Sequence, residues 1–153
     1  MKNTLFLVVV LLAGGFFATP PPIALKGYFF CAGAVIDGTD KGLACYALTQ
    51  SNCRNGTAVL AYEQLANKAK GQPANRIVDT VHVRVNSAKQ DLSITTCAEP
   101  SGKRRSYFVL SSLKQPGEYL SGIQRAWTYN AKDELIEVPL KMVKCLNNDY
   151  GAD

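Results

Sequence analysis

A single histidine limits the acid–base chemistry that this sequence can perform. His82 lies in the stretch 76–86, RIVDTVHVRVN, whose alternating apolar and polar residues are typical of a strand with one buried face. Asp79 is close in sequence but falls on the other face of that strand, so it is badly placed to orient the imidazole. Nucleophilic catalysis requires a nucleophile, a base and an orienting group within hydrogen-bond reach. No local set of this kind exists, and we predict that His82 is a polar residue on the wet face.

Metal-ligand spacing is missing from the sequence as well. The cysteines contain no C-x-x-C pair, which argues against a zinc site or a thioredoxin-like redox motif. Asp37, Asp40 and the pair Asp133-Glu134 lie in expected hairpin turns, where Asp is favoured by turn geometry. We therefore predict no catalytic residue, no metal site and no cofactor, and we lean against an enzyme.

The cysteines instead indicate structural disulfides. The five are Cys31, Cys45, Cys53, Cys97 and Cys145. In an oxidising compartment they would form two bridges and leave one thiol. Choosing the odd residue and then pairing the other four leaves roughly 15 arrangements, and the spacing favours none of them.

The N-terminus has the layout of a secretory signal peptide. Lys2 precedes an unbroken apolar run, residues 5–12, and small residues then allow cleavage after Gly15 or, less favourably, after Ala18. The apolar stretch is shorter than the roughly 20 residues that a membrane-spanning helix needs. We predict a signal peptide at 1–15, a linker at 16–26, a secreted or periplasmic protein, and no stable membrane span after cleavage.

Basic and aromatic residues supply the best candidate binding surface. It comprises Lys103, Arg104, Arg105, Arg125 and Trp127. Cations beside exposed aromatic rings suit another protein or an anionic glycan. The formal net charge of +5 falls to +4 when Lys2 is removed with the leader, so a nucleic-acid partner is not expected. The alternative is that 103–105 is a solvated loop and that Trp127 belongs to the core.

The secondary structure that must position these residues is predicted to contain both strands and one helix. Apolar runs at 28–36 and 43–49 flank a Gly/Asp-rich turn and predict a β-hairpin whose first strand is deeply buried. Ala58, Tyr62, Leu65, Ala66 and Ala69 recur at helical offsets and predict an amphipathic helix over 57–70. Strands follow at 76–86, 92–98, 106–113, 120–130 and 135–144, and Pro139 indicates an edge position or a bulge for the last.

This order predicts an α+β domain over residues 27–146, an antiparallel meander sheet packed on one amphipathic helix, with a tail at 147–153. It resembles cystatin-like helix-on-sheet folds in element order, without a sequence motif of such a family. An all-β barrel or sandwich carrying one helix is the alternative.

Three classes of function remain open. The first is a small exported, disulfide-stabilised, non-catalytic binding or inhibitor-like domain. The second is a subunit of an extracellular assembly, a homo-oligomer joined through the 28–36 edge or the leftover thiol. The third is a small secreted hydrolase with a site assembled around His82 from distant residues.

Overall fold

The computed structural model describes residues 25–66, 75–113 and 115–151. Within these ranges the chain forms strands joined by turns and short 3-10 helices. The first half contains β1 (Phe29–Val35), β2 (Lys41–Ala47), η1 (Ser51–Cys53), β3 (Gly56–Gln64) and β4 (Arg76–Val85). The second half contains β5 (Gln90–Ala98), β6 (Arg104–Ser112), β7 (Ile123–Tyr129), β8 (Leu135–Glu137), η3 (Leu140–Met142) and β9 (Lys144–Cys145).

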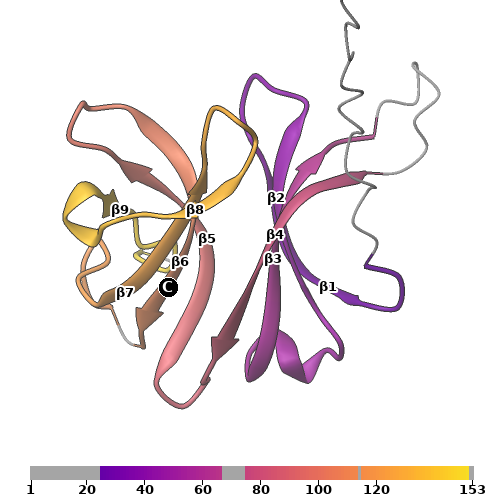
Figure 1. Cartoon of the computed structure of the whole chain (residues 1–153). Coiled ribbons are helices and arrows are strands. Elements are labelled where there is room, and N and C mark those ends of the chain that lie inside the picture. The colour runs from indigo at the N-terminus through magenta and orange to yellow at the C-terminus, as the bar shows by residue number, and fades with distance from the viewer. Residues whose placement is uncertain (1–24, 67–74, 114, 152–153) are drawn as a thin grey trace, which may run out of the picture.

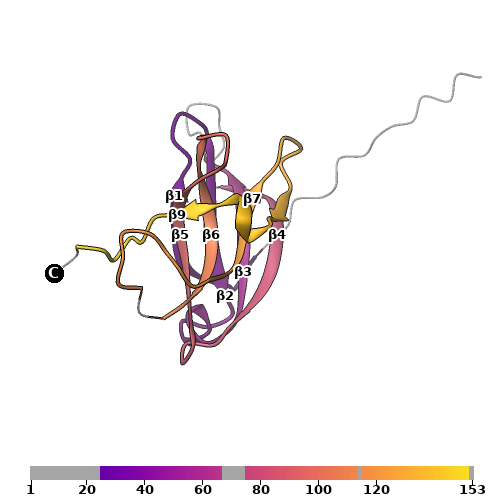
Figure 2. The same cartoon turned by 90° about the vertical axis from the view of Figure 1, so that its left-hand side faces the viewer.

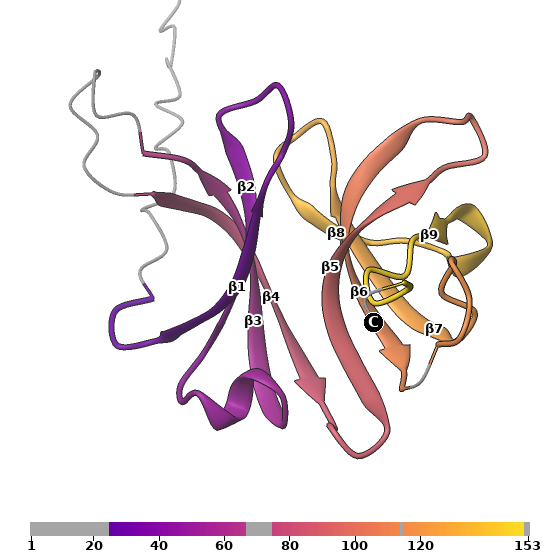
Figure 3. The same cartoon turned by 180° about the vertical axis from the view of Figure 1, so that it is seen from behind.

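The strands form two antiparallel sheets that face each other (Figure 1, and from behind in Figure 3). The first sheet has the order β1-β2-β3-β4 and the second the order β8-β7-β6-β5-β9. Figure 2 shows the second sheet in front, with the strands of both sheets running in similar directions. This is the aligned packing of a β-sandwich.

The interior between the sheets is apolar because alternate residues of each central strand point toward it. Leu43 and Leu60 from the first sheet and Phe108, Leu110 and Trp127 from the second belong to one buried cluster. A smaller cluster covers the outer face of the second sheet, where the Cys97–Cys145 disulfide packs with Tyr107, Val109 and Ala126.

The predicted α+β fold is wrong, because no helix packs on a sheet within the described residues. The stretch expected to be helical begins with β3, the strand between β2 and β4. Ala58 and Tyr62 lie four residues apart, a spacing that places residues on one face of a helix and also of a strand. Residues 58–62 are buried on both faces of β3, so tertiary contacts override the helical preference of alanine. Residues 67–70 lie outside the described ranges.

The alternative prediction, an all-β barrel or sandwich with one helix, is nearer to the observed fold, although its single helix is also absent from the described part of the chain. The resemblance to cystatin-like folds is wrong for the same reason. The sequence does place the strands well, since each predicted strand region overlaps an observed one.

The strand predicted at 76–86 is present as β4, but its alternation is broken by a bulge. Tyr62 pairs with Asp79 and Glu63 pairs with Ile77, which leaves Val78 as the extra residue. Val78 and Val81 pack against the cluster between the sheets, together with the buried Val83 and Val85. The apolar face of β4 therefore covers the second sheet and not a helix.

Two further strand predictions need correction. β1 was expected to be deeply buried, yet it forms an edge of its sheet and pairs with β2 alone among the described strands. The strand expected over 135–144 ends at Glu137, and Pro139 leads into η3 because proline cannot continue the ladder. As Pro139 indicated, β8 is an edge strand of its sheet.

The predicted signal peptide lies outside the described residues, as does most of the predicted linker. Residues 25–66, 75–113 and 115–151 contain no helix that is long and apolar enough to cross a membrane.

Candidate binding site

Trp127 lies in the core between the two sheets. It pairs with Phe108 on the neighbouring strand, and only 1% of its surface is exposed. Trp127 is therefore a core residue, and its ring is not accessible to a ligand.

Arg125 is exposed on the same strand and is held by an ion pair. Its Nε and Nη2 donate to the two carboxylate oxygens of Glu137 at 2.9 and 2.6 Å. These bonds lower the pKa of Glu137 and raise the pKa of Arg125. The guanidinium also lies 4.6 Å from the centroid of the Trp127 ring, so it caps one end of the core.

The basic triplet lies at the other end of the second sheet. Arg125 is opposite Leu110, near the end of β6, whereas Arg104 begins that strand. Six residues of extended chain separate the two positions, about 20 Å. The five residues predicted as one surface are therefore not brought together.

Within the triplet, only the Arg105 side chain forms an ion pair or a hydrogen bond with a described residue. Arg105 forms an ion pair with Glu99 at 3.4 Å, donates to the backbone oxygen of Tyr129 and stacks on its ring. Lys103 and Arg104 are exposed and form no ion pair with any described residue. Both line an open cleft of about 510 Å³ beside the β1–β2 turn.

A fourth cation, Lys144, joins this end of the sheet. Ala98 pairs with Arg104 on one side and with Lys144 on the other, so the two basic side chains flank it. Arg104, Lys144 and Tyr119 line a second cleft of about 310 Å³, and the Lys144 ammonium lies 3.8 Å from the centre of the Tyr119 ring. The sequence offered no signal for this neighbour, because β9 is only two residues long. We call Lys103, Arg104 and Lys144 the basic end.

His82 stands exposed on the outer face of the first sheet, opposite Val59. Among hydrogen bonds between described residues, none involves its imidazole. Asp79 points to the other side, where its carboxylate accepts from the backbone N–H of Leu135 at 2.7 Å. In the described ranges no three His, Cys, Asp or Glu side chains lie close enough together to hold a metal ion.

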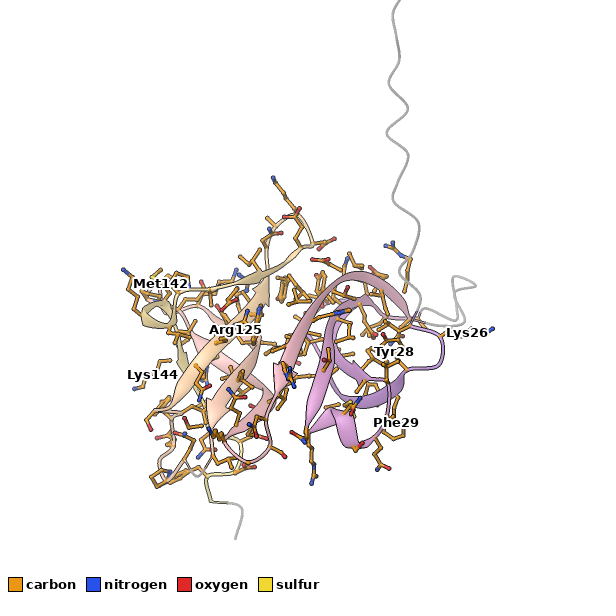
Figure 4. The ribbon with its side chains drawn as sticks, turned by 60° about the horizontal axis from the view of Figure 1, so that its bottom comes forward. Lys26, Tyr28, Phe29, Arg125, Met142 and Lys144 are labelled. Atoms are coloured by element: carbon orange, nitrogen blue, oxygen red, sulfur yellow. A yellow bond between two sulfur atoms is a disulfide. The ribbon has the colours of Figure 1, made fainter. Side chains whose placement is uncertain are left out.

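Four strongly exposed apolar side chains lie on and beside β1. Phe29 is 44% exposed, Phe30 55% and Val35 61%, and Leu48 just after β2 is 62% exposed. Figure 4 shows Phe29 and Tyr28 on the opposite side of the molecule from Met142 and Lys144. We call Phe29, Phe30, Val35 and Leu48 the apolar edge.

The ring of Phe30 lies beside Gly33 on the same strand. A Cβ at Gly33 would lie only 3.0 Å from the ring, so the glycine provides the space that the ring covers. On its other side the ring meets Tyr46 edge-on, with the centroids 5.7 Å apart. Tyr46 is itself fixed, since its hydroxyl donates to the buried carboxylate of Glu63 at 2.5 Å. Phe30 is thus held in place while more than half of its surface stays in water.

The prediction of two bridges and one thiol is confirmed. Cys31 is bonded to Cys53 and Cys97 to Cys145, while Cys45 is free and buried. The first bridge ties β1 to η1, and the second joins directly opposed residues of β5 and β9.

The chain matches no family model, no curated protein and no solved structure.

Proposed function

We propose that this protein is an exported, non-catalytic interaction domain that joins a second copy of itself by strand pairing along β1. The observation that carries the proposal is the coincidence of two signals on one strand. β1 pairs with no described strand other than β2, and its flanking side chains form the apolar edge. Unpaired backbone groups beside exposed apolar side chains form a ready template for another strand.

β1 also lacks two of the devices that usually protect an edge. The stretch 28–36, YFFCAGAVI, contains no charged residue and no proline. It does contain a bulge, which lies between Phe30 and Ala32 and leaves the strand paired with β2 on both sides. The half-strand from Ala32 to Val35 is therefore regular, and among the described strands only β2 pairs with it.

A second copy is the partner that β1 itself fits best. An antiparallel pair of identical strands related by a two-fold axis forms a self-complementary interface, in which each strand supplies the same groups to the other. Because β1 is uncharged, the two copies would not repel each other. Phe30 and Val35 of both chains would then lose water together, which is the main favourable contribution to such an interface.

The solution mass of the mature protein tests this proposal. We expect a concentration-dependent dimer for the wild type by light scattering after size exclusion. The double substitution Phe30→Lys and Val35→Lys should give a monomer, since four lysines would meet at the interface. Both positions are more than half exposed, so the monomer should stay folded.

Met142→Lys is the control, because Met142 is another exposed apolar residue, with 44% of its surface accessible, and lies far from β1. It should leave the dimer intact. A wild type that stays monomeric at every concentration, or a dimer that survives the double substitution, would refute the proposal.

A second candidate function rests on the basic end, which we propose binds an anionic glycan. Arg104 lies between two adjoining clefts, and Lys103 lines one and Lys144 the other. Tyr119, a residue that is 38% exposed, has its ring against the Lys144 ammonium. Retention on a heparin column should fall for Arg104→Glu with Lys144→Glu. Retention should fall much less for Arg84→Glu with Arg76→Glu, a charge-matched pair on the first sheet. Equal losses for the two pairs would show net charge alone to be responsible.

A further inference from the structure

Three cysteines line one cleft between the two sheets. The cleft has a volume of about 480 Å³ and opens where the edge of β1 faces β5. The Cys31–Cys53 disulfide and the free thiol of Cys45 all contribute to its wall. Cys45 is only 4% exposed and belongs to the buried cluster, against which Cys31 is packed.

The bulge in β1 explains why Cys31 and Cys45 come together. Ala32 pairs with Cys45 and Phe30 pairs with Tyr46, which leaves Cys31 as the extra residue opposite this pair of β2 residues. In such a bulge two residues of one strand oppose a single residue of the other. Cys31 therefore has two neighbouring cysteines, its disulfide partner Cys53 in η1 and Cys45 across the strand pair.

We infer that Cys45 is the third member of a thiol–disulfide exchange centre, in which it displaces Cys53 from Cys31. The Cys45 thiol gives its proton to solvent, and the thiolate sulfur bonds to Sγ of Cys31. The Cys31–Cys53 bond breaks, and its electron pair leaves on Sγ of Cys53, which takes up a proton. One disulfide and one thiol are present before and after, so no oxidant or reductant is needed.

The exchange would change where the reactive thiol lies. Cys45 is enclosed between the sheets, whereas Cys53 is half-buried in η1, between the exposed residues Ser51 and Arg54. The new Cys31–Cys45 bridge would join β1 directly to β2, and η1 would lose its covalent tie. The product would present a surface thiol capable of bonding to a second thiol-bearing molecule.

The other disulfide lies outside this centre. Cys97 and Cys145 are fully buried in the cluster on the outer face of the second sheet, away from the cleft. The exchange therefore involves three of the five cysteines, and the Cys97–Cys145 bond provides an internal reference for the experiment.

The centre can be tested on the oxidised mature protein, kept without added thiol and without oxygen at mildly alkaline pH. Samples are labelled in the folded state with a maleimide and then mapped by mass spectrometry. Trypsin leaves Cys45 and Cys53 on one peptide, residues 42–54, so chymotryptic cleavage after Tyr46 or Leu48 is required to separate them. We expect label to accumulate on Cys53 together with a Cys31–Cys45 bridge, at a constant one thiol per molecule.

Cys45→Ala is the matched control and should show no label on Cys53. A second variant, Cys53→Ser, tests the geometry without depending on the rate of exchange. On oxidation it should form the Cys31–Cys45 bridge, with Cys97–Cys145 unchanged. Label confined to Cys45 after prolonged incubation, or Cys31 and Cys45 both remaining thiols in Cys53→Ser, would overturn the inference.

Discussion

Asp79 on β4 joins the two sheets through the backbone of Leu135. One carboxylate oxygen accepts the N–H of Leu135 at 2.7 Å, and the other accepts the N–H of Thr80 at 2.8 Å. Leu135 is buried and begins β8, the edge of the second sheet. The acidic side chain nearest to the single histidine in sequence therefore has a structural role, on the face of β4 opposite to that histidine.

Asp79→Ala should lower the free energy of unfolding by about 1–3 kcal/mol, because it leaves a partly buried N–H without its acceptor. Urea denaturation measures the change. Asp37→Ala, at an exposed turn position, should change stability by less than about 0.5 kcal/mol. Equal effects of the two substitutions would contradict the role that we assign to Asp79.

The fluorescence of Trp127 should report on the packing of the core and not on the binding of a ligand. Because it is the only tryptophan and is 1% exposed, native fluorescence should be blue-shifted and poorly quenched by acrylamide. Trp127→Ala should destabilise the protein by about 3–5 kcal/mol, as expected for a large buried ring. A red-shifted, readily quenched native spectrum would place this ring in water and refute the packing described above.

The free thiol predicts a pH dependence of stability. Burial raises the pKa of Cys45 to about 11, against about 8.5 for a thiol in an unfolded chain. A raised folded pKa means that the native state holds the proton more tightly. The contribution of the protonated Cys45 thiol to the free energy of unfolding is therefore fully present below about pH 8.5 and is lost as the pH rises toward 11.

Comparing the wild type with Cys45→Ala isolates this effect. Arg54 and Asp91, the charged groups that line the same cleft, are present in both proteins, as are the tyrosines whose pKa values are raised. Between about pH 8.5 and 11, the unfolding free energy of the wild type should fall relative to that of Cys45→Ala. A constant difference across that range would show that the Cys45 thiol is not desolvated.

The Cys97–Cys145 bridge should stabilise the fold more than any single ion pair. It closes a sequence separation of 48 residues and lies in a fully buried cluster. Replacing both cysteines with alanine should cost about 2–5 kcal/mol. Arg125→Ala, which removes an exposed ion pair, should cost about 1 kcal/mol or less. Thermal unfolding followed by circular dichroism would rank the two, and a larger effect of Arg125→Ala would contradict this expectation.

Local patterns in the sequence were sufficient to place most strands. Turn residues and β-branched runs mark the strands from β4 to β7, and Pro139 marks where β8 must stop. The cysteine count also predicted two bridges and one thiol. Their pairing required the placement of η1 beside β1 and the register of β5 on β9, which depend on contacts between distant parts of the chain.

The errors arose where a local pattern has two interpretations. Ala58 and Tyr62 share a face in a helix and in a strand, and only the position of β3 between two other strands decides between them. The apolar run of β1 is equally typical of a buried strand and of an interacting edge. Likewise, no spacing in the sequence could reveal that Arg125 and Arg104 lie at opposite ends of the second sheet, or that Lys144 lies next to Arg104.

Amide hydrogen exchange of β1 at low and high protein concentration tests the proposed self-association most directly. If two copies pair along this strand, the amides of residues 32–35 that do not bond to β2 should become protected as concentration rises. The same outward-facing amides of the Phe30→Lys, Val35→Lys variant should stay unprotected. Exchange at β8, the edge of the other sheet, should not depend on concentration. Exchange in β1 at one rate at every concentration would contradict the proposal.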